Sequence, residues 1–164
     1  MSGDRNFYTF RGYLMMPDQK QMTPSMEDYL EMIYRIHLQE GPTRTTELAA
    51  RLNVQAPSVT KTVQKLARLG LLHYKKYGLI RLTPKGEKLG KFLLKRHILI
   101  ESFLKLIGVK EGHLLQDTEM IEHHLSASAY NQIQLLYQFF KANPAVLDKF
   151  HRYKLERGGP DHPD

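Results

Sequence analysis

Carboxylates at helical spacing are the side chains of this sequence best suited to chemistry. Asp28 and Glu31 stand three residues apart. Glu119, Glu122 and His123 follow i, i+3, i+4 spacing. On helices, the members of each group share one face, from which carboxylates and an imidazole can bind a cation. Each group also has a simpler interpretation, because acidic residues on a helix usually form a solvated face.

A second imidazole extends these two groups. His97 lies among the apolar residues Leu93, Leu94 and Ile98, where a histidine is either a ligand or a hydrogen-bonded member of the core. Hard oxygen ligands combined with imidazoles suit Mn²⁺ or Fe²⁺, and bridging carboxylates allow two ions. Spacing alone does not show that the three helices meet. The candidate metal ligands are Asp28, Glu31, His97, Glu119, Glu122 and His123.

The positive charge of the chain is concentrated in one segment. The 164 residues carry a net charge of +7. Residues 44–96 contain 13 Lys and Arg against two acids, a local charge of +11, so the rest of the chain has a net charge of −4. This segment favours a polyanionic partner, most commonly nucleic acid, over a basic face that serves only solubility.

The elements expected in the basic segment have the order of a winged helix-turn-helix. The sequence predicts helices over 23–40, 46–52 and 57–69, then two short strands around a basic turn within 71–82. In that fold the second helix of the motif enters the major groove and the wing contacts phosphates. A helical bundle followed by a hairpin would show the same order. The predicted DNA contacts are Ser58, Thr60, Lys61, Gln64, Lys65 and Arg68 on the helix, and Lys75 and Lys76 in the wing.

The remaining chain is expected to be helical throughout, which makes the protein mostly α. A long helix is predicted from the cap Thr83 to Ile107, followed by helices over 110–116, 118–125, 127–142 and 144–156. Their apolar residues provide a candidate dimer surface, although some of them must belong to the core. This surface comprises Leu114, Leu115, Ile121, Leu125, Ile133, Leu136, Phe139 and Phe140.

Composition excludes several classes of protein. The chain has no Cys, which removes disulfide scaffolds, cysteine nucleophiles and thiolate metal sites. Apolar runs are too short to span a bilayer, and no secretory signal is present, so we expect a cytoplasmic protein without a membrane partner. An enzyme remains an alternative because carboxylate-bridged dimetal centres also catalyse reactions, but no nucleophile motif or phosphate-binding loop accompanies the acids.

Several segments together resemble the manganese-dependent branch of the diphtheria-toxin-repressor family. The similarity runs in unbroken order from about Met22 to Phe140, and its motifs include Thr23-Pro-Ser-Met-Glu-Asp-Tyr-Leu-Glu and Ile121-Glu-His-His-Leu. The resemblance implies a homodimeric repressor of manganese uptake genes that binds operator DNA and takes no organic substrate. It also implies a winged helix-turn-helix domain at 23–92 and an all-helical metal-binding and dimerisation domain at 93–157, without an SH3-like third domain. Residues 1–22 would be an N-terminal extension and 158–164 a tail.

The resemblance also assigns the metal ligands. The ligands of that family's binuclear site fall on the same six residues that the spacing singled out. The iron-responsive branch has Met at the position of Asp28 and Cys at the position of Glu122, so carboxylates at both positions favour Mn²⁺. The implied cofactor is Mn²⁺, two ions per chain. The alternatives are an iron-responsive regulator and a winged-helix regulator that senses no metal.

Overall fold

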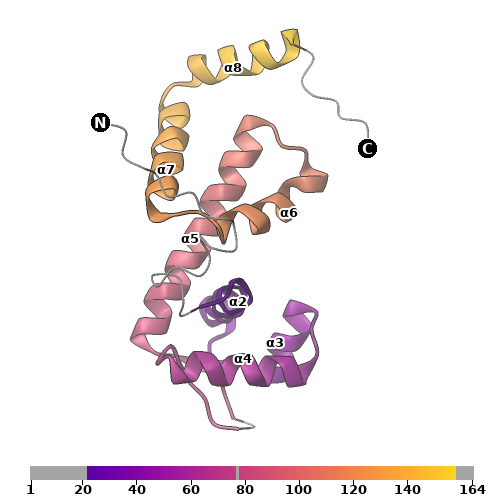
Figure 1. The fold of residues 1–164 in the computed structure, drawn as a ribbon, viewed down its shortest axis with the longest axis vertical. Coiled ribbons are helices and arrows are strands. Elements are labelled where there is room, and N and C mark those ends of the chain that lie inside the picture. The colour runs from indigo at the N-terminus through magenta and orange to yellow at the C-terminus, as the bar shows by residue number, and fades with distance from the viewer. Residues whose placement is uncertain (1–21, 77, 158–164) are drawn as a thin grey trace, which may run out of the picture. The chain divides into compact units, whose positions relative to one another are not determined.

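The computed structural model describes residues 22–76 and 78–157. The chain folds there into helices joined by short loops and one hairpin (Figure 1). It divides into two compact units that meet between Leu94 and Lys95. The predicted tail, and all of the predicted extension except Met22, lie outside the described residues. No helix in the described part is both long and apolar enough to cross a membrane.

The N-terminal unit has the element order expected of a winged helix-turn-helix. The strands pair antiparallel, with Leu72 opposite Leu82, and an isolated bridge joins Thr43 to Ile80, the residue just before β2. The hydroxyl of Thr83 accepts the Gly86 N–H at 3.0 Å, as expected for a helix cap. The elements are α2 (Pro24–Glu40), α3 (Thr45–Leu52), α4 (Ala56–Arg68), β1 (Leu72–His73), β2 (Arg81–Leu82) and the first part of α5 (Pro84–Ile107).

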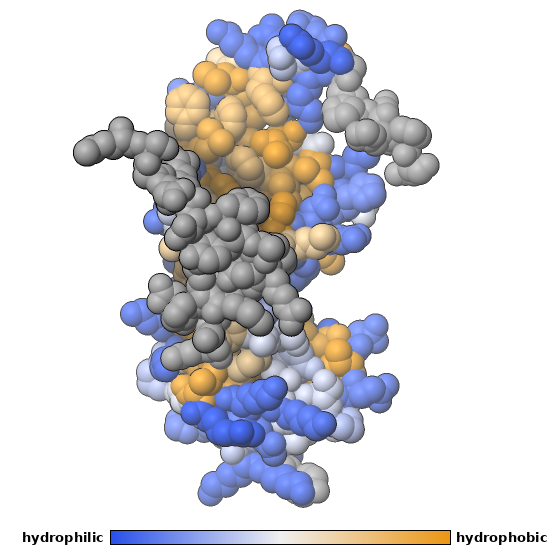
Figure 2. Space-filling view, in the orientation of Figure 1, coloured by the Kyte–Doolittle hydropathy of each residue, from blue (hydrophilic) through white to orange (hydrophobic). Residues whose placement is uncertain are grey.

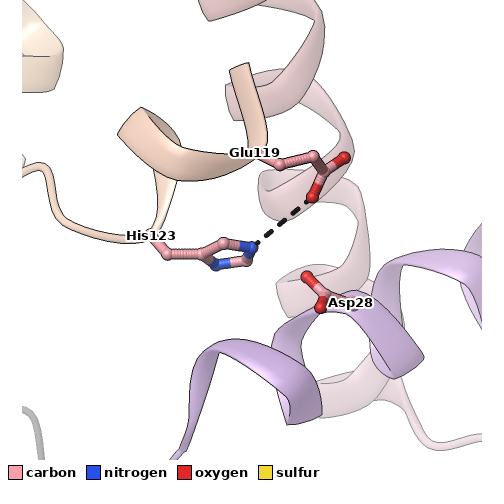
Figure 3. A group of neighbouring side chains, drawn as sticks. All are labelled: Asp28, Glu119 and His123. Atoms are coloured by element: carbon pink, nitrogen blue, oxygen red, sulfur yellow. Dashed lines mark ion pairs between the residues drawn. The ribbon is translucent and has the colours of Figure 1, made fainter. Parts of the chain in front are cut away.

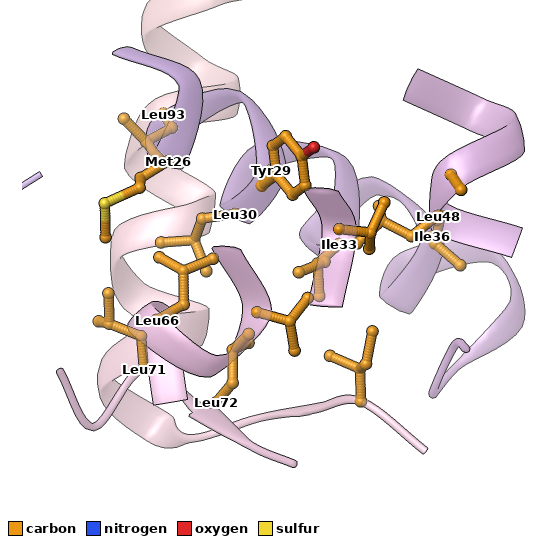
Figure 4. Packing of buried hydrophobic residues seen from close by; sticks show 14 residues of the cluster. Met26, Tyr29, Leu30, Ile33, Ile36, Leu48, Leu66, Leu71, Leu72 and Leu93 are labelled. Carbon is orange, nitrogen blue, oxygen red and sulfur yellow. The ribbon is translucent and has the colours of Figure 1, made fainter. Parts of the chain in front are cut away.

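One apolar core holds these elements together (Figure 4). From α2 it takes Leu30 and Ile33, and from α4 it takes Val63 and Leu66. Leu93 adds a residue from α5, and all five side chains are at most 2% exposed. Truncating such a residue to Ala typically costs about 2–5 kcal/mol, so the core fixes α2 directly against α4.

The C-terminal unit contains the rest of α5, α6 (Glu111–Glu122), α7 (Ala127–Ala142) and α8 (Pro144–Glu156). The sequence predicted two helices over 110–125, and this was wrong, because α6 is continuous. Thr118, in the middle, is buried, and its hydroxyl donates to the Leu114 carbonyl at 2.7 Å. A threonine that bonds one turn back does not need to end a helix.

Helices α7 and α8 leave several large apolar side chains exposed. Neither helix has a buried residue. Leu135, Leu136 and Phe139 are 58%, 43% and 49% exposed, and hydrophobic residues gather on the face of this unit turned toward the viewer (Figure 2). Within the dimer surface expected from the sequence, Leu114 instead belongs to the core with Ile100. Three further residues of that surface are partly buried against the same core: Ile121, Leu125 and Ile133. A contiguous apolar surface of this kind is typical of a protein interface.

Two helical glycines, Gly86 and Gly112, differ in the space around them, and this difference predicts the effect of substitution on stability. A Cβ on Gly86 would stand 1.9 Å from the backbone oxygen of Leu71, whereas a Cβ on Gly112 would meet nothing within 4 Å. Gly86→Ala should therefore destabilise the protein by about 2 kcal/mol or more, because the obstruction is backbone. Gly112→Ala, the matched control, should be neutral or stabilising by up to about 1 kcal/mol. Urea unfolding followed by circular dichroism measures both, and equal stability of the two variants would contradict the prediction.

Candidate metal centre and nucleic-acid interface

Four of the predicted ligands meet within the C-terminal unit. Nδ1 of His97, on α5, lies 3.4 Å from both carboxylate oxygens of Glu122 and 3.5 Å from Oε1 of Glu119, both on α6. His123 follows α6 directly and keeps a helical backbone. Its Nε2 lies 3.7 Å from an oxygen of each glutamate. Figure 3 shows the ion pair between Glu119 and His123. Each imidazole therefore faces both carboxylates.

Burial makes this cluster suited to a cation. Glu122 is 1% exposed and His97 is 6% exposed. Among the described residues, Oε2 of Glu122 accepts no hydrogen bond. Removing a carboxylate from water is costly unless positive charge or donors replace the lost solvent. A buried carboxylate beside two imidazoles, with one oxygen left without a hydrogen bond, fits a divalent metal ion.

A buried arginine orients one of these imidazoles. Nη2 of Arg96 lies 3.3 Å from Nδ1 of His123, and Arg96 is 7% exposed. Because a guanidinium can only donate, Nδ1 is the acceptor of this hydrogen bond. This contact leaves Nε2 directed toward the two glutamates. Nε2 is therefore the ring nitrogen of His123 that would bind a metal ion.

The other two predicted ligands lie on α2, in the N-terminal unit. Asp28 is half-buried and Glu31 is 7% exposed, and the two stand one turn apart as the spacing predicted. Figure 3 includes Asp28 on this helix. Nε and Nη2 of Arg35 both donate to Oε1 of Glu31, at 2.9 and 2.6 Å.

Sequence reasoning missed both arginines. Arg35 is four residues after Glu31, and Arg96 immediately precedes His97. The i, i+4 spacing of Glu31 and Arg35 was a usable signal for their ion pair. No comparable signal exists for Arg96 and His123, since they are 27 residues apart and meet only through the packing of α5 on α6.

Helix α4 has one apolar face and one polar face. Val59, Val63 and Leu66 are fully buried. Of the predicted DNA contacts, Ser58, Lys61, Lys65 and Arg68 are exposed, whereas Thr60 and Gln64 are half-buried. In the wing, Lys75 and Lys76 are exposed, and Tyr77 lies outside the described residues. The exposed lysines and Arg68 give α4 and the wing the positive surface that DNA phosphates require.

Comparisons with known protein families match almost the whole described chain. The family described as the N-terminal DNA-binding domain of iron-dependent repressors matches residues 21–80. The family described as the metal-binding and dimerisation domain of iron-dependent repressors matches residues 83–151.

Individual relatives are similar over most of their length. The transcriptional regulator MntR of Lysinibacillus sphaericus strain C3-41 is 47% identical over 134 residues, which cover 82% of this chain and 96% of that protein. MntR of Listeria monocytogenes strain EGD-e is 49% identical over 125 residues, covering 76% of this chain and 88% of that protein.

Solved structures show the same arrangement of elements. The manganese regulator SloR has 29% identity and a TM-score of 0.63, and the metal-dependent regulator MtsR has 32% identity and a TM-score of 0.64. Each similarity covers 72% of this chain and 55% of the other. This chain therefore matches only about half the length of those two proteins.

The buried cluster predicts metal-dependent stability. A divalent cation such as Mn²⁺ at 100 times its Kd should stabilise the protein by about 2.7 kcal/mol, which raises the Tm by roughly 5–10 °C for a chain of this size. Glu122→Gln should remove most of that increase, because it removes a charge and an oxygen ligand. Differential scanning calorimetry of chelator-treated protein measures the shift.

Glu111→Gln is the matched control. Glu111 is also on α6, but its side chain is 73% exposed and pairs with Lys105 at 2.6 Å. Its hydrogen bond and charge raise the pKa of Lys105. The Glu111 variant should keep the full increase in Tm. A full increase in the Glu122 variant as well would contradict the assignment.

Proposed function

Because the chain belongs to the iron-dependent repressor family, and is a metal-dependent, DNA-binding transcriptional repressor rather than an enzyme, we propose that Mn²⁺ is its activating metal. Curated regulators named MntR, at 43–49% identity, support this proposal. A solved relative at 28% identity and TM-score 0.62 is described as a manganese-dependent transcriptional repressor in complex with manganese. From the family resemblance, we propose manganese uptake genes as its targets.

The observation that carries the proposal is the chemistry of the donor set. The cluster of the C-terminal unit offers two carboxylates and two imidazoles and no sulfur. We propose that Asp28 and Glu31 complete it, so that the metal ligands are Asp28, Glu31, His97, Glu119, Glu122 and His123. Carboxylate oxygens and imidazoles suit Mn²⁺, whereas softer sulfur ligands favour other metals.

Four carboxylates and two imidazoles supply more donor atoms than one ion uses. A carboxylate can bridge two metal ions, as it does in helical proteins with dinuclear centres. We therefore propose two ions per chain, with at least one bridging glutamate.

The repression mechanism that we propose depends on helix α2. Its Asp28 and Glu31 would bind metal, while Leu30 and Ile33 share the core with residues of α4. Bound Mn²⁺ supplies the positive charge that allows four carboxylates to lie together. With α2 held, α4 is held as well, and two copies present their helices at a separation near one DNA turn, about 34 Å. A coupling of about 1.4–2.8 kcal/mol, which is 10- to 100-fold in affinity, suffices for a switch.

The proposed DNA interface is the polar face of α4 together with the wing. Its residues are Ser58, Thr60, Lys61, Gln64, Lys65, Arg68, Lys75 and Lys76. Lysines there would contact phosphates or guanine, and Gln64 is able to pair with adenine. We assign this role to a domain spanning 23–92, and metal binding and dimerisation to 93–157.

The proposed assembly is a homodimer in the cytoplasm. Leu136 and Phe139, on α7, are 43% and 49% exposed. A second copy of the same surface covers them most economically, because two-fold symmetric contacts are self-complementary. The family's dimerisation domain, which includes α7, supports this assignment.

Metal stoichiometry tests the site. Calorimetric titration of chelator-treated protein with Mn²⁺ should give about two ions per chain, with each ligand substitution weakening binding by roughly 10-fold or more. Asp28→Asn is the test variant, and Asp148→Asn, on exposed α8, is its control. One ion per chain would contradict the bridged pair, and unchanged binding by Asp28→Asn would remove α2 from the site.

Metal-dependent DNA binding tests the function. Duplexes selected from a random-sequence pool in the presence of Mn²⁺ should bind 10- to 100-fold more weakly when a chelator replaces the metal. The same duplexes should tighten Mn²⁺ binding by an equal factor, because the coupling is reciprocal. Equal DNA affinity with and without Mn²⁺ would contradict the proposal, and activation by Fe²⁺ alone would favour an iron-responsive regulator.

The basic face of α4 generates a separate prediction. Lys61→Ala and Lys65→Ala should each weaken binding to mixed-sequence duplex DNA and lower the slope of log affinity against log salt by about 0.9. Lys141→Ala, on α7, removes the same charge from the other unit and should leave the slope unchanged. Fluorescence anisotropy at several salt concentrations measures all three, and an unchanged slope in both α4 variants would place the interface elsewhere.

A further inference from the structure

One proposed metal ligand is already paired with a cation of the chain itself. Arg35 directs two donors to the same oxygen of Glu31, at 2.9 and 2.6 Å. The side chain of Glu31 is 10% exposed, and that of Arg35 is 36% exposed. Water screens this ion pair only in part, so the charge of the Arg35 guanidinium acts more strongly on neighbouring groups than it would in a fully solvated pair.

The neighbouring helix shows the ordinary case. On α3, Arg51 also follows a glutamate, Glu47, by four residues, with the nearest charged atoms 3.9 Å apart. These side chains are 43% and 37% exposed. The two pairs have the same spacing along their helices, but only the first has a glutamate, Glu31, that is withdrawn from water.

We propose that Arg35 competes with the metal for Glu31 and thereby raises the Mn²⁺ concentration at which the repressor becomes active. The proposal rests on the proposed function, because it takes Glu31 as a metal ligand. A divalent cation on that carboxylate stands close to the guanidinium, and the two like charges repel. Metal binding must then weaken the pair of Arg35 and Glu31 or proceed against its positive charge.

The opposite effect is the alternative to be tested. An arginine that only oriented Glu31 would raise metal affinity, since it would hold the ligand ready. Glu31 needs little help of this kind, because it lies within a 17-residue helix and its side chain is almost entirely enclosed. Enclosure already restricts its rotamers. The repulsive effect of Arg35 therefore dominates.

Mn²⁺ affinity in charge variants decides between the two effects. Calorimetric titration of the full, chelator-treated chain should show that Arg35→Met binds Mn²⁺ about 10-fold more tightly than the natural protein. Arg35→Lys, which keeps the charge, should stay within about 3-fold of it. The gain should shrink at high salt, because Arg35 is partly exposed. Weaker or unchanged binding by Arg35→Met would overturn the proposal.

Arg51→Met is the matched control, since it removes the same charge from the same unit. Its Mn²⁺ affinity should equal that of the natural protein. An equal gain in this variant would mean that overall charge acts, and would overturn the specific role of Arg35. If Arg35→Met does not fold, Arg35→Gln provides the same loss of charge in a polar side chain.

Two further measurements separate this proposal from the proposed function. Glu31→Gln must weaken Mn²⁺ binding, and if it does not, the ligand assignment fails and the role of Arg35 with it. If Glu31→Gln weakens binding while Arg35→Met leaves it unchanged, the proposal for Arg35 alone fails. The metal-free Arg35→Met protein should have a lower Tm and a larger Mn²⁺-induced increase than the natural protein. An increase that is no larger would also overturn the proposal.

Discussion

The charge of one enclosed carboxylate governs the chemistry of the C-terminal unit. Glu122 is almost without contact to solvent and lies beside His97 and His123. A carboxylate withdrawn from water requires compensating positive charge or hydrogen-bond donors, and among the described residues Oε2 of Glu122 has no hydrogen-bond donor. Burying Glu122 in this way costs free energy when no cation is present, and the same arrangement favours cation binding. The stability of this unit is therefore connected to its proposed role as a metal sensor.

Arginines next to the proposed ligands connect charge balance to regulation. Arg35 binds Glu31, and Arg96 holds the ring of His123. Each arginine supplies positive charge or a donor to a proposed metal ligand. An activating metal ion must then interact with the ligands more favourably than these arginines do. The sensitivity of the repressor to metal therefore depends on the arginines as well as on the ligands.

Helix α2 connects two of the proposed metal ligands to the proposed DNA-binding helix through a shared core. One side of it carries Asp28 and Glu31, and the other packs Leu30 and Ile33 into the core that also holds Val63 of α4. Closely packed cores transmit displacement because they have little free volume. A cation held by the proposed ligands of α2 would therefore constrain α4 without contacting it.

Local sequence determined most of the elements and was enough to propose the six metal ligands. Helical spacing grouped Glu119 with Glu122, and glycine ended α2 and α4 where the sequence predicted, within a residue or two, since caps and side-chain periodicity depend only on neighbours along the chain. Tertiary structure decided the rest. Thr118 allowed one continuous α6, Leu114 joined the core, and Arg96 reached an imidazole on another helix. Such outcomes depend on which helix faces meet, and that is set by the packing of the whole unit.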